Sequence, residues 1–169
     1  DLDRVQFAKV SWDKTLEGNT LKYWAKSLGL EPTVENGAEL VIKAQLNGGA
    51  SAIYHAMDEG DVENIMKHPL TMIASDGRLV VPGEGHPHPR WYGTFPRVLG
   101  LFVREKQVLP LEEAIYKMSF LPAKTIGIKG RGLIKKGMFA DITIFDKNRI
   151  IDRATFEKPH QYSEGIHYV

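Results

Sequence analysis

The alternation of short apolar runs with helical stretches before Asp76 constrains the fold of this chain most strongly. Residues 5–10 mix apolar and polar side chains at a period near two, which predicts a strand. Residues 50–57 and 70–74 are short, mostly apolar runs, and both are predicted to be buried strands. Helices are predicted between these runs, and such an order is typical of parallel strands joined by right-handed helical crossovers. The sequence therefore predicts an α/β fold.

The helices predicted in this part have recognisable ends. Thr33 is a suitable N-cap for a helix over residues 34–46. Two shorter helices are predicted, one after Asn19 or Thr20 and one after Asp58. The apolar stripe that the longest helix is expected to turn toward the core consists of Val34, Ala38, Val41, Ile42 and Leu46.

The pattern changes in the second half of the chain. Two apolar stripes predict helices over residues 95–103 and 111–118, and a third helical turn is predicted over residues 122–125. Glycines then fall close together in residues 127–137, and residues 140–145 alternate between apolar and polar side chains. This last part is predicted to form a hairpin or a small sheet.

Asp76 follows the predicted strand over residues 70–74 and precedes Gly77. Because α/β barrels place catalytic groups at the C-terminal ends of their strands, Asp76 is the first candidate catalytic residue. Asp-Gly is also a common turn signal, and the residues alone leave both interpretations open. The loop over residues 86–90, with the sequence HPHPR, adds two histidines and an arginine.

The chain is too short for a closed barrel. A (β/α)₈ barrel needs eight strands and about 250 residues, whereas this chain has 169 residues. It is therefore either a small open α/β sheet or the C-terminal part of a larger fold. Open strand edges need to be paired or covered. We therefore expect a homo-oligomer, namely a dimer, or pairing with a missing N-terminal half.

Composition excludes several classes of function. The absence of cysteine excludes disulfides, thiol nucleophiles and thiolate metal sites, and it fits a reducing compartment, so we expect a cytoplasmic protein. The net charge of +1 gives no indication of nucleic-acid binding. No apolar run approaches the roughly 18 residues that a membrane-spanning helix requires. Neither a nucleic acid nor a membrane is therefore an expected partner.

Long motifs are spread over most of the chain. They are AIYHAMDEGDV at residues 52–62, TMIASDG at 71–77, HPHPRWYGTFPRVLG at 86–100, KGMFADITIFD at 136–146 and DRATFEKPHQYSEGI at 152–166. Together these motifs resemble those of N-acyl-D-amino-acid deacylases (D-aminoacylases), which belong to the metal-dependent amidohydrolase superfamily. The resemblance implies the C-terminal part of a TIM-barrel amidohydrolase, with about three βα units followed by helices and a small β-sandwich segment. Residues 1–126 would belong to the barrel, and residues 127–169 would return into the sandwich and form a C-terminal tail.

The resemblance also implies an activity for the intact enzyme, namely hydrolysis of the linear amide bond of N-acyl-D-amino acids by a zinc-activated water. Asp76 matches the catalytic acid and base, which also approaches the metal. Arg90 matches the clamp on the carboxylate of the substrate, a role that suits a planar guanidinium. His88 and Tyr54 would lie at the substrate pocket. From the residues alone, Arg90 can equally be a solvated loop charge.

The metal site that the resemblance implies is incomplete in this chain. Asp76 is its only expected group, because the histidine ligands of the family belong to earlier barrel segments. We therefore expect this chain alone to bind no catalytic zinc and to be an inactive fragment. The alternatives are a non-catalytic remnant or assembly module, and one subunit of a split amidohydrolase.

Overall fold

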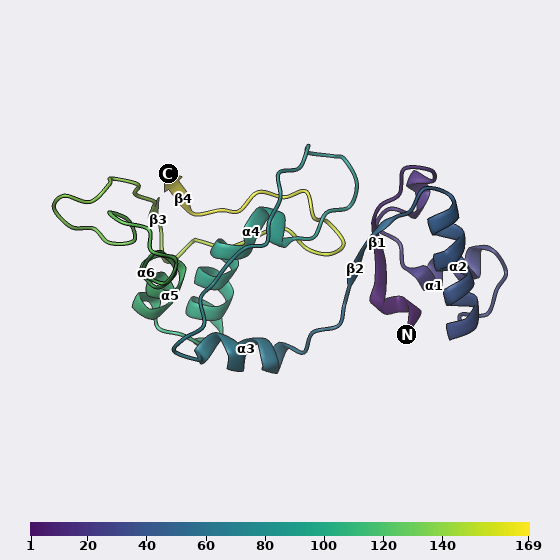
Figure 1. Cartoon of the computed structure of the whole chain (residues 1–169), viewed down its shortest axis with the longest axis horizontal. Helices are drawn as coiled ribbons and strands as arrows, with labels where there is room; N and C mark the ends of the chain where they lie inside the picture. Colours follow the sequence, from purple (N-terminus) through teal and green to yellow (C-terminus); the bar gives the residue numbers. More distant parts are fainter. The chain divides into compact units, whose positions relative to one another are not determined.

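The computed structural model describes residues 1–169 and divides into two compact units, whose elements are labelled in Figure 1. Unit 1 contains Asp1–Met57, Leu79–His88 and Thr155–His160, and unit 2 contains Asp58–Arg78, Pro89–Ala154 and Gln161–Val169. Each unit therefore combines segments that are far apart in the sequence.

Unit 1 contains two strands that are separated in the sequence by helices. Its elements are the 3₁₀ helix η1 (Leu2–Arg4), β1 (Val5–Lys9), the 3₁₀ helix η2 (Lys14–Leu16), α1 (Leu21–Ser27), α2 (Val34–Leu46) and β2 (Ser51–Tyr54). Two predicted caps are confirmed, because the hydroxyl of Thr20 accepts a hydrogen bond from the N–H of Tyr23, and that of Thr33 accepts one from Asn36. Each cap satisfies an N–H group that has no partner within its helix.

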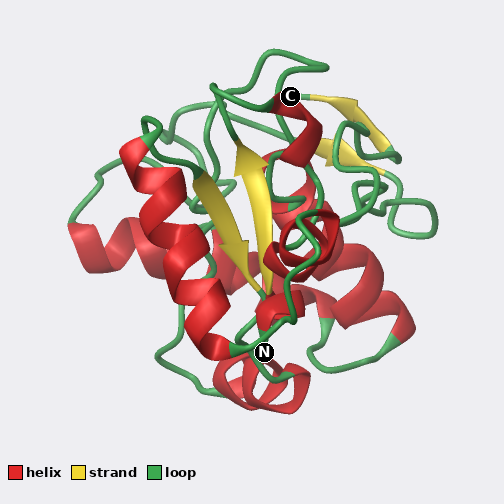
Figure 2. Cartoon of the chain, turned by 90° about the vertical axis from the view of Figure 1, so that its right-hand side faces the viewer, coloured by secondary structure: helices red, strands yellow, loops and turns green.

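β1 and β2 are antiparallel, with Val5 opposite Tyr54 and an irregularity between Phe7 and Lys9 (Figure 2). The prediction of parallel strands is therefore wrong for this pair. A single crossover helix would return the chain to the start of the first strand. Two successive helices, α1 and α2, instead bring the chain back to the end where β1 finished, so β2 runs back along β1.

The core of unit 1 is formed by β1 together with α1 and α2. Its buried residues are Phe7, Val10, Leu16, Leu21, Trp24, Ala25, Leu40 and Ala44. The rings of Phe7 and Trp24 meet edge to face, with centroids 5.8 Å apart, which is a favoured geometry for aromatic pairs.

α2 turns a different face to this core than the sequence predicts. Its buried residues are Gly37, Leu40 and Ala44. Val34 and Leu46, at the two ends of the predicted stripe, are 74% and 84% exposed. A Cβ atom on Gly37 would lie 2.5 Å from Cδ2 of Leu2, so the small residue allows a close approach on the buried face. The predicted stripe is consequently left on the surface.

Unit 2 is mostly helical. Its elements are α3 (Glu59–Lys67), α4 (Arg90–Arg97), the π-helix η3 (Val98–Glu105), α5 (Leu111–Met118), α6 (Phe120–Ile126), β3 (Ile144–Phe145) and β4 (Ile166–Tyr168). Its buried core consists of Met66, Val98, Leu99, Phe102, Leu109, Ala114 and Ile150. The predicted cap Asp58 is confirmed, because its carboxylate accepts hydrogen bonds from the N–H groups of Gly60 and Asp61.

Residues 70–74 do not form the predicted strand. They belong to an irregular segment, and the two sheets of the structure contain only β1 with β2 and β3 with β4. An apolar run becomes a strand only when a neighbouring strand supplies the ladder of hydrogen bonds. Here the N–H of Ile73 instead donates to the carbonyl of Lys117 in α5, at 3.1 Å.

The glycine-rich part contributes one short strand. β3 pairs antiparallel with β4, which comes from the C-terminal tail, and residues 127–137 contain no strand. A small sheet is thus present, but its second strand comes from the C-terminal tail and not, as predicted, from residues 127–145, which form no hairpin. Gly130, Gly132 and Gly137 all have positive φ angles, which turn the chain and interrupt an extended run.

The chain as a whole is mixed α/β, with two separate two-stranded antiparallel sheets and no barrel. The predicted boundary near residue 126 refers to the domains of an intact enzyme, and it stays a prediction. None of the helices combines the length and the apolar character that crossing a membrane requires.

Candidate functional site

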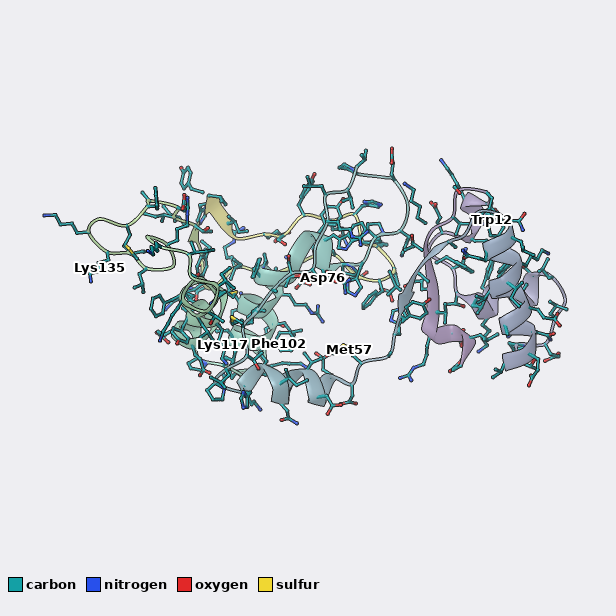
Figure 3. All side chains as sticks on the ribbon, viewed as in Figure 1. Trp12, Met57, Asp76, Phe102, Lys117 and Lys135 are labelled. Atoms are coloured by element: carbon teal, nitrogen blue, oxygen red, sulfur yellow. The ribbon has the colours of Figure 1, made fainter.

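Asp76 lies in an irregular segment of unit 2 and is labelled in Figure 3. Its φ angle is +47°, in the left-handed region that few residues other than glycine adopt. The hydroxyl of Ser75 accepts a hydrogen bond from the N–H of Gly77 at 3.1 Å and so closes the turn around Asp76. A left-handed non-glycine residue that projects a carboxylate is a feature that often marks functional sites.

Arg90, the first residue of α4, forms an ion pair with Asp76 in which Nη2 lies 2.6 Å from Oδ2. The hydroxyl of Thr94, which follows a kink at Gly93 in α4, lies 3.0 Å from the carbonyl of Arg90 and 3.5 Å from that of Ser75, so its single hydrogen is shared between the two. The side chains of Asp76 and Arg90 are 82% and 43% exposed. Because exposed ion pairs contribute little to stability, this pair is expected to add little to the stability of unit 2.

The pair combines two complementary groups. A carboxylate can accept a proton from an attacking water and return it to a leaving group. A guanidinium can hold a carboxylate through two parallel hydrogen bonds. In this structure the carboxylate of Asp76 lies where Arg90 would hold the carboxylate of another molecule.

Tyr54 and His88 belong to unit 1. Tyr54 is the exposed last residue of β2. The ring of His88 meets the ring of Phe156 edge to face, with centroids 5.0 Å apart. Within one unit, the structure therefore brings together Asp76 and Arg90 of the predicted site residues. Roles for Tyr54 and His88 stay predictions.

His55 and His86, both half-buried, take part in a polar network around the buried Gln6 that the sequence did not reveal. Nε2 of His55 lies 3.1 Å from Oε1 of Gln6, and Nε2 of His86 lies 2.5 Å from the carbonyl of Phe156. Gln6 also donates to the carbonyls of Gly18 and Phe156, at 2.9 and 3.0 Å. These contacts give His55 a structural role within unit 1.

The residues of this chain do not by themselves form a zinc site. No group of three or more histidine, aspartate or glutamate side chains is arranged to hold a metal ion. The partner of Asp76 is the cation of Arg90 rather than a second ligand.

Lys117 is a further residue that sequence analysis missed. It is 1% exposed, although a lysine in an amphipathic helix is ordinarily solvated. Its ammonium group contacts the segment that leads to Asp76. No pattern in the sequence distinguishes it from the exposed lysines of neighbouring turns.

The chain matches a model of the amidohydrolase family over residues 22–169. Among curated proteins it is similar to two enzymes of Alcaligenes xylosoxydans xylosoxydans. The D-aminoacylase is 48% identical over 71% of this chain and 24% of its own length. The N-acyl-D-aspartate deacylase is 42% identical over 91% of this chain and 32% of its own length.

Solved structures agree with these matches. The N-acyl-D-glutamate deacylase of Bordetella bronchiseptica, complexed with zinc and a phosphonate mimic of the tetrahedral intermediate, superimposes with a TM-score of 0.84 at 36% identity. That match covers 98% of this chain and 33% of the deacylase. A D-aminoacylase structure gives a TM-score of 0.85 at 38% identity, over 97% of this chain and 32% of the other.

The chain thus spans about one third or less of the length of these relatives. Within that span, the family model and the identities above 35% cover most of its residues. The chain therefore belongs to the amidohydrolase family, with D-aminoacylases and N-acyl-D-amino acid deacylases as its homologues.

Proposed function

We propose that this chain is the C-terminal portion of a TIM-barrel amidohydrolase that hydrolyses the amide bond of N-acyl-D-amino acids. The observation that carries the proposal is the Asp76–Arg90 pair, held at 2.6 Å on a left-handed turn against the first turn of α4. The similarity to deacylases supports the same substrate class.

The two side chains fit the geometry of such a substrate. In an N-acyl amino acid, the scissile amide nitrogen and the free carboxylate are bonded to the same carbon. A clamp on the carboxylate therefore holds the amide a few bonds away, within reach of a neighbouring base. Arg90 binds the carboxylate of the substrate, and Asp76 takes the proton of the attacking water and delivers it to the leaving nitrogen. His88 and Tyr54 are proposed to complete the pocket.

Zinc is proposed for the intact enzyme only. A related deacylase structure contains zinc, whereas this chain supplies Asp76 without a second ligand nearby. We propose that the remaining ligands come from a further part of the polypeptide or from a separate subunit. Alone, the chain is expected to show negligible deacylase activity, and a cytoplasmic location remains part of the proposal.

A chimera tests the proposed roles. This chain replaces the matching part of the Alcaligenes D-aminoacylase, and hydrolysis of N-acetyl-D-amino acids is measured. Asp76→Asn is expected to lower kcat by about 10²- to 10⁴-fold, the usual contribution of a general acid and base. Arg90→Ala is expected to raise KM more than it lowers kcat, because it removes a binding contact.

Asp61→Asn is the matched control, because Asp61 is an exposed acid on α3 in the same unit. Its kinetics are expected to equal those of the unmodified chimera. An active chimera whose kcat is unaffected by Asp76→Asn would remove Asp76 from the proposed role.

One observation favours the alternative of an assembly module. The surface of α2 carries a row of exposed apolar side chains, namely Val34, Val41, Ile42 and Leu46. Exposed apolar surfaces of this kind often mark interfaces. An inactive chimera, together with concentration-dependent self-association of the chain that Ile42→Lys abolishes, would favour this alternative over the enzyme.

A further inference from the structure

The segment over residues 68–78 carries Asp76 but has no strand partner, so its backbone groups must find other hydrogen bonds. Two of its carbonyls face one side chain of α5. Nζ of Lys117 donates to the carbonyl of His68 at 2.5 Å and to that of Thr71 at 3.3 Å. The carbonyl of Lys117 accepts from the N–H of Ile73 at 3.1 Å. One residue thus holds the first half of the segment.

The cation of Lys117 is almost completely removed from solvent, with 1% of its side chain exposed. Its third contact is Oε1 of Glu113, one turn earlier in α5, at 3.6 Å. An ammonium group has three hydrogens to donate, and here three oxygens surround it. Burying a charge is unfavourable unless such partners compensate for the lost water. If this position served packing alone, a neutral side chain would be buried at a smaller free-energy penalty.

The far end of the segment is held by different residues. Asp76 is paired with Arg90, and the carbonyl of Ser75 accepts from the hydroxyl of Thr94. Both partners belong to α4. The segment is therefore fixed at two points, by Lys117 at its start and by the first turns of α4 at its end, and Figure 3 labels Lys117 and Asp76 at these two points.

We propose that Lys117 is a positioning residue that sets the place of Asp76 by clamping the carbonyls of His68 and Thr71. The inference rests on the proposed function, since it assigns Lys117 a part in the chemistry of Asp76. Lys117 does not touch the reacting atoms. It acts through the backbone between Thr71 and Asp76, which no sheet supports.

Amide hydrogen exchange of the 169-residue chain tests the clamp directly. Lys117→Met gives a neutral side chain of similar shape, one atom shorter, and removes the donors. Exchange of the hydrogen-bonded amides in this segment, those of Thr71 and Ile73, is expected to accelerate on the order of tenfold, while η3 and unit 1 keep their rates, because only a local opening becomes easier. Lys124→Met, at an exposed position of α6, is the matched control and leaves all rates unchanged. Unchanged exchange in residues 69–77, or an equal rise throughout unit 2, would overturn the clamp.

A chemical rescue keeps the test decisive if the methionine variant folds poorly. The chain contains no cysteine, so Lys117→Cys can be alkylated at a single site under denaturing conditions and then refolded. Reaction with 2-bromoethylamine restores an ammonium group of similar reach, and reaction with 1-bromopropane gives a neutral group of the same length. The aminoethyl form is expected to recover slow exchange in residues 69–77, and the propyl form is not. Equal rates in the two forms would show that the charge and its donors have no positioning role.

Kinetics of the chimera separate this inference from the proposed function. Lys117→Met is expected to lower kcat by about 100-fold, since small displacements of a catalytic group have effects of this size, and to leave KM unchanged because Arg90 is untouched. Loss of turnover in Asp76→Asn together with an unchanged kcat in Lys117→Met would overturn the positioning role alone. Turnover that is insensitive to Asp76→Asn would overturn the proposed function, and the exchange rates would still decide whether Lys117 clamps the segment.

Discussion

Unit 1 holds its irregular segments through neutral side chains, whereas unit 2 uses a buried cation. In unit 1 the amide of Gln6 bonds to His55 and to the carbonyls of Gly18 and Phe156. In unit 2 the ammonium group of Lys117 instead donates to the carbonyls of His68 and Thr71. Both groups are buried, and both satisfy backbone carbonyls that no sheet or helix uses.

Because the amide of Gln6 is neutral and the ammonium group of Lys117 is charged, we expect their removal to affect stability differently. A neutral amide is buried at a modest penalty, so its loss mainly leaves former partners without hydrogen bonds. A buried ammonium carries a large desolvation penalty, which disappears together with its contacts when the residue becomes apolar. Gln6 should therefore contribute more to the global stability of its unit, whereas Lys117 should mainly fix the position of the segment over residues 68–78.

Gln6→Leu is expected to have the largest effect on stability. It leaves the carbonyl of Gly18 and the ring of His55 without their partner, whereas the carbonyl of Phe156 keeps its contact with His86. The free energy of unfolding of unit 1 should fall by about 3 kcal/mol, measured by amide exchange as a function of urea. Gln45→Leu, at an exposed position of α2, is the matched control. A loss no larger than that of the control would contradict the importance of the network.

Lys117→Met is expected to change the global stability of unit 2 by well under about 1 kcal/mol, because the lost hydrogen bonds and the relieved desolvation oppose each other. The same urea-dependent exchange experiment gives this value for the amides of η3 and α5. A loss greater than that of Gln6→Leu would reverse the comparison between the two units.

The pKa values of two carboxyl groups, one in each unit, should respond differently to ionic strength. In unit 2, a hydrogen bond from Arg153 is the main cause that lowers the pKa of Glu164 below 4.5. In unit 1, a hydrogen bond from the hydroxyl of Thr155 lowers the pKa of Glu157. At about 1 M salt, where charges are screened within about 3 Å, the pKa of Glu164 should rise toward its ordinary value while that of Glu157 changes less.

Carbon-13 NMR titration of the two side-chain carboxyls measures both pKa values. Because the folded pKa of Glu164 lies below its unfolded value, its contribution to stability is present above about pH 4.5 and is lost as the pH falls through the folded pKa. Salt should therefore reduce this small contribution. Equal salt responses of Glu164 and Glu157 would contradict the assigned causes.

The exposed stripe of α2 should show the smallest effect on stability. Ile42→Lys changes a side chain that is already on the surface of unit 1, so the free energy of unfolding should change by no more than about 0.5 kcal/mol. Sedimentation velocity of the same variant tests the expected homo-oligomer. A dimer that persists in Ile42→Lys would place its interface elsewhere, and a large loss of stability would contradict the burial of the opposite face.

Local features of the sequence predicted the starts of three helices. Thr33 and Asp58 cap their helices as predicted, and Thr20 is the cap among the two candidates Asn19 and Thr20, because capping depends on a side chain and backbone N–H groups within three residues. The helix predicted over residues 95–103 instead begins at Arg90 and continues as the π-helix η3 to Glu105. The prediction of a strand over residues 70–74 was wrong because strands do not depend on local features alone. Strand formation depends on a neighbour that is distant in the sequence, and this segment has none in the structure.

The candidate site divides in the same way. The motif around Asp76 and Arg90 identified both residues through a resemblance, and the comparisons confirm the family. Their separation of 2.6 Å arises because the turn at Asp76 lies against α4. No motif identified Lys117, because its burial depends on carbonyls that only the tertiary structure brings around its ammonium group.

The sequence by itself determined the class of the chain, the caps of its helices and, through long motifs, its family. These properties depend on short-range chemistry or on residue identity. Only the tertiary structure decided that β2 runs antiparallel to β1, that α2 packs through Gly37, and that Lys117 lies beneath the segment leading to Asp76. The physical reason is that both faces of α2 carry apolar residues and a strand edge can pair with a parallel or an antiparallel neighbour, so only contacts with distant segments of the chain select one arrangement.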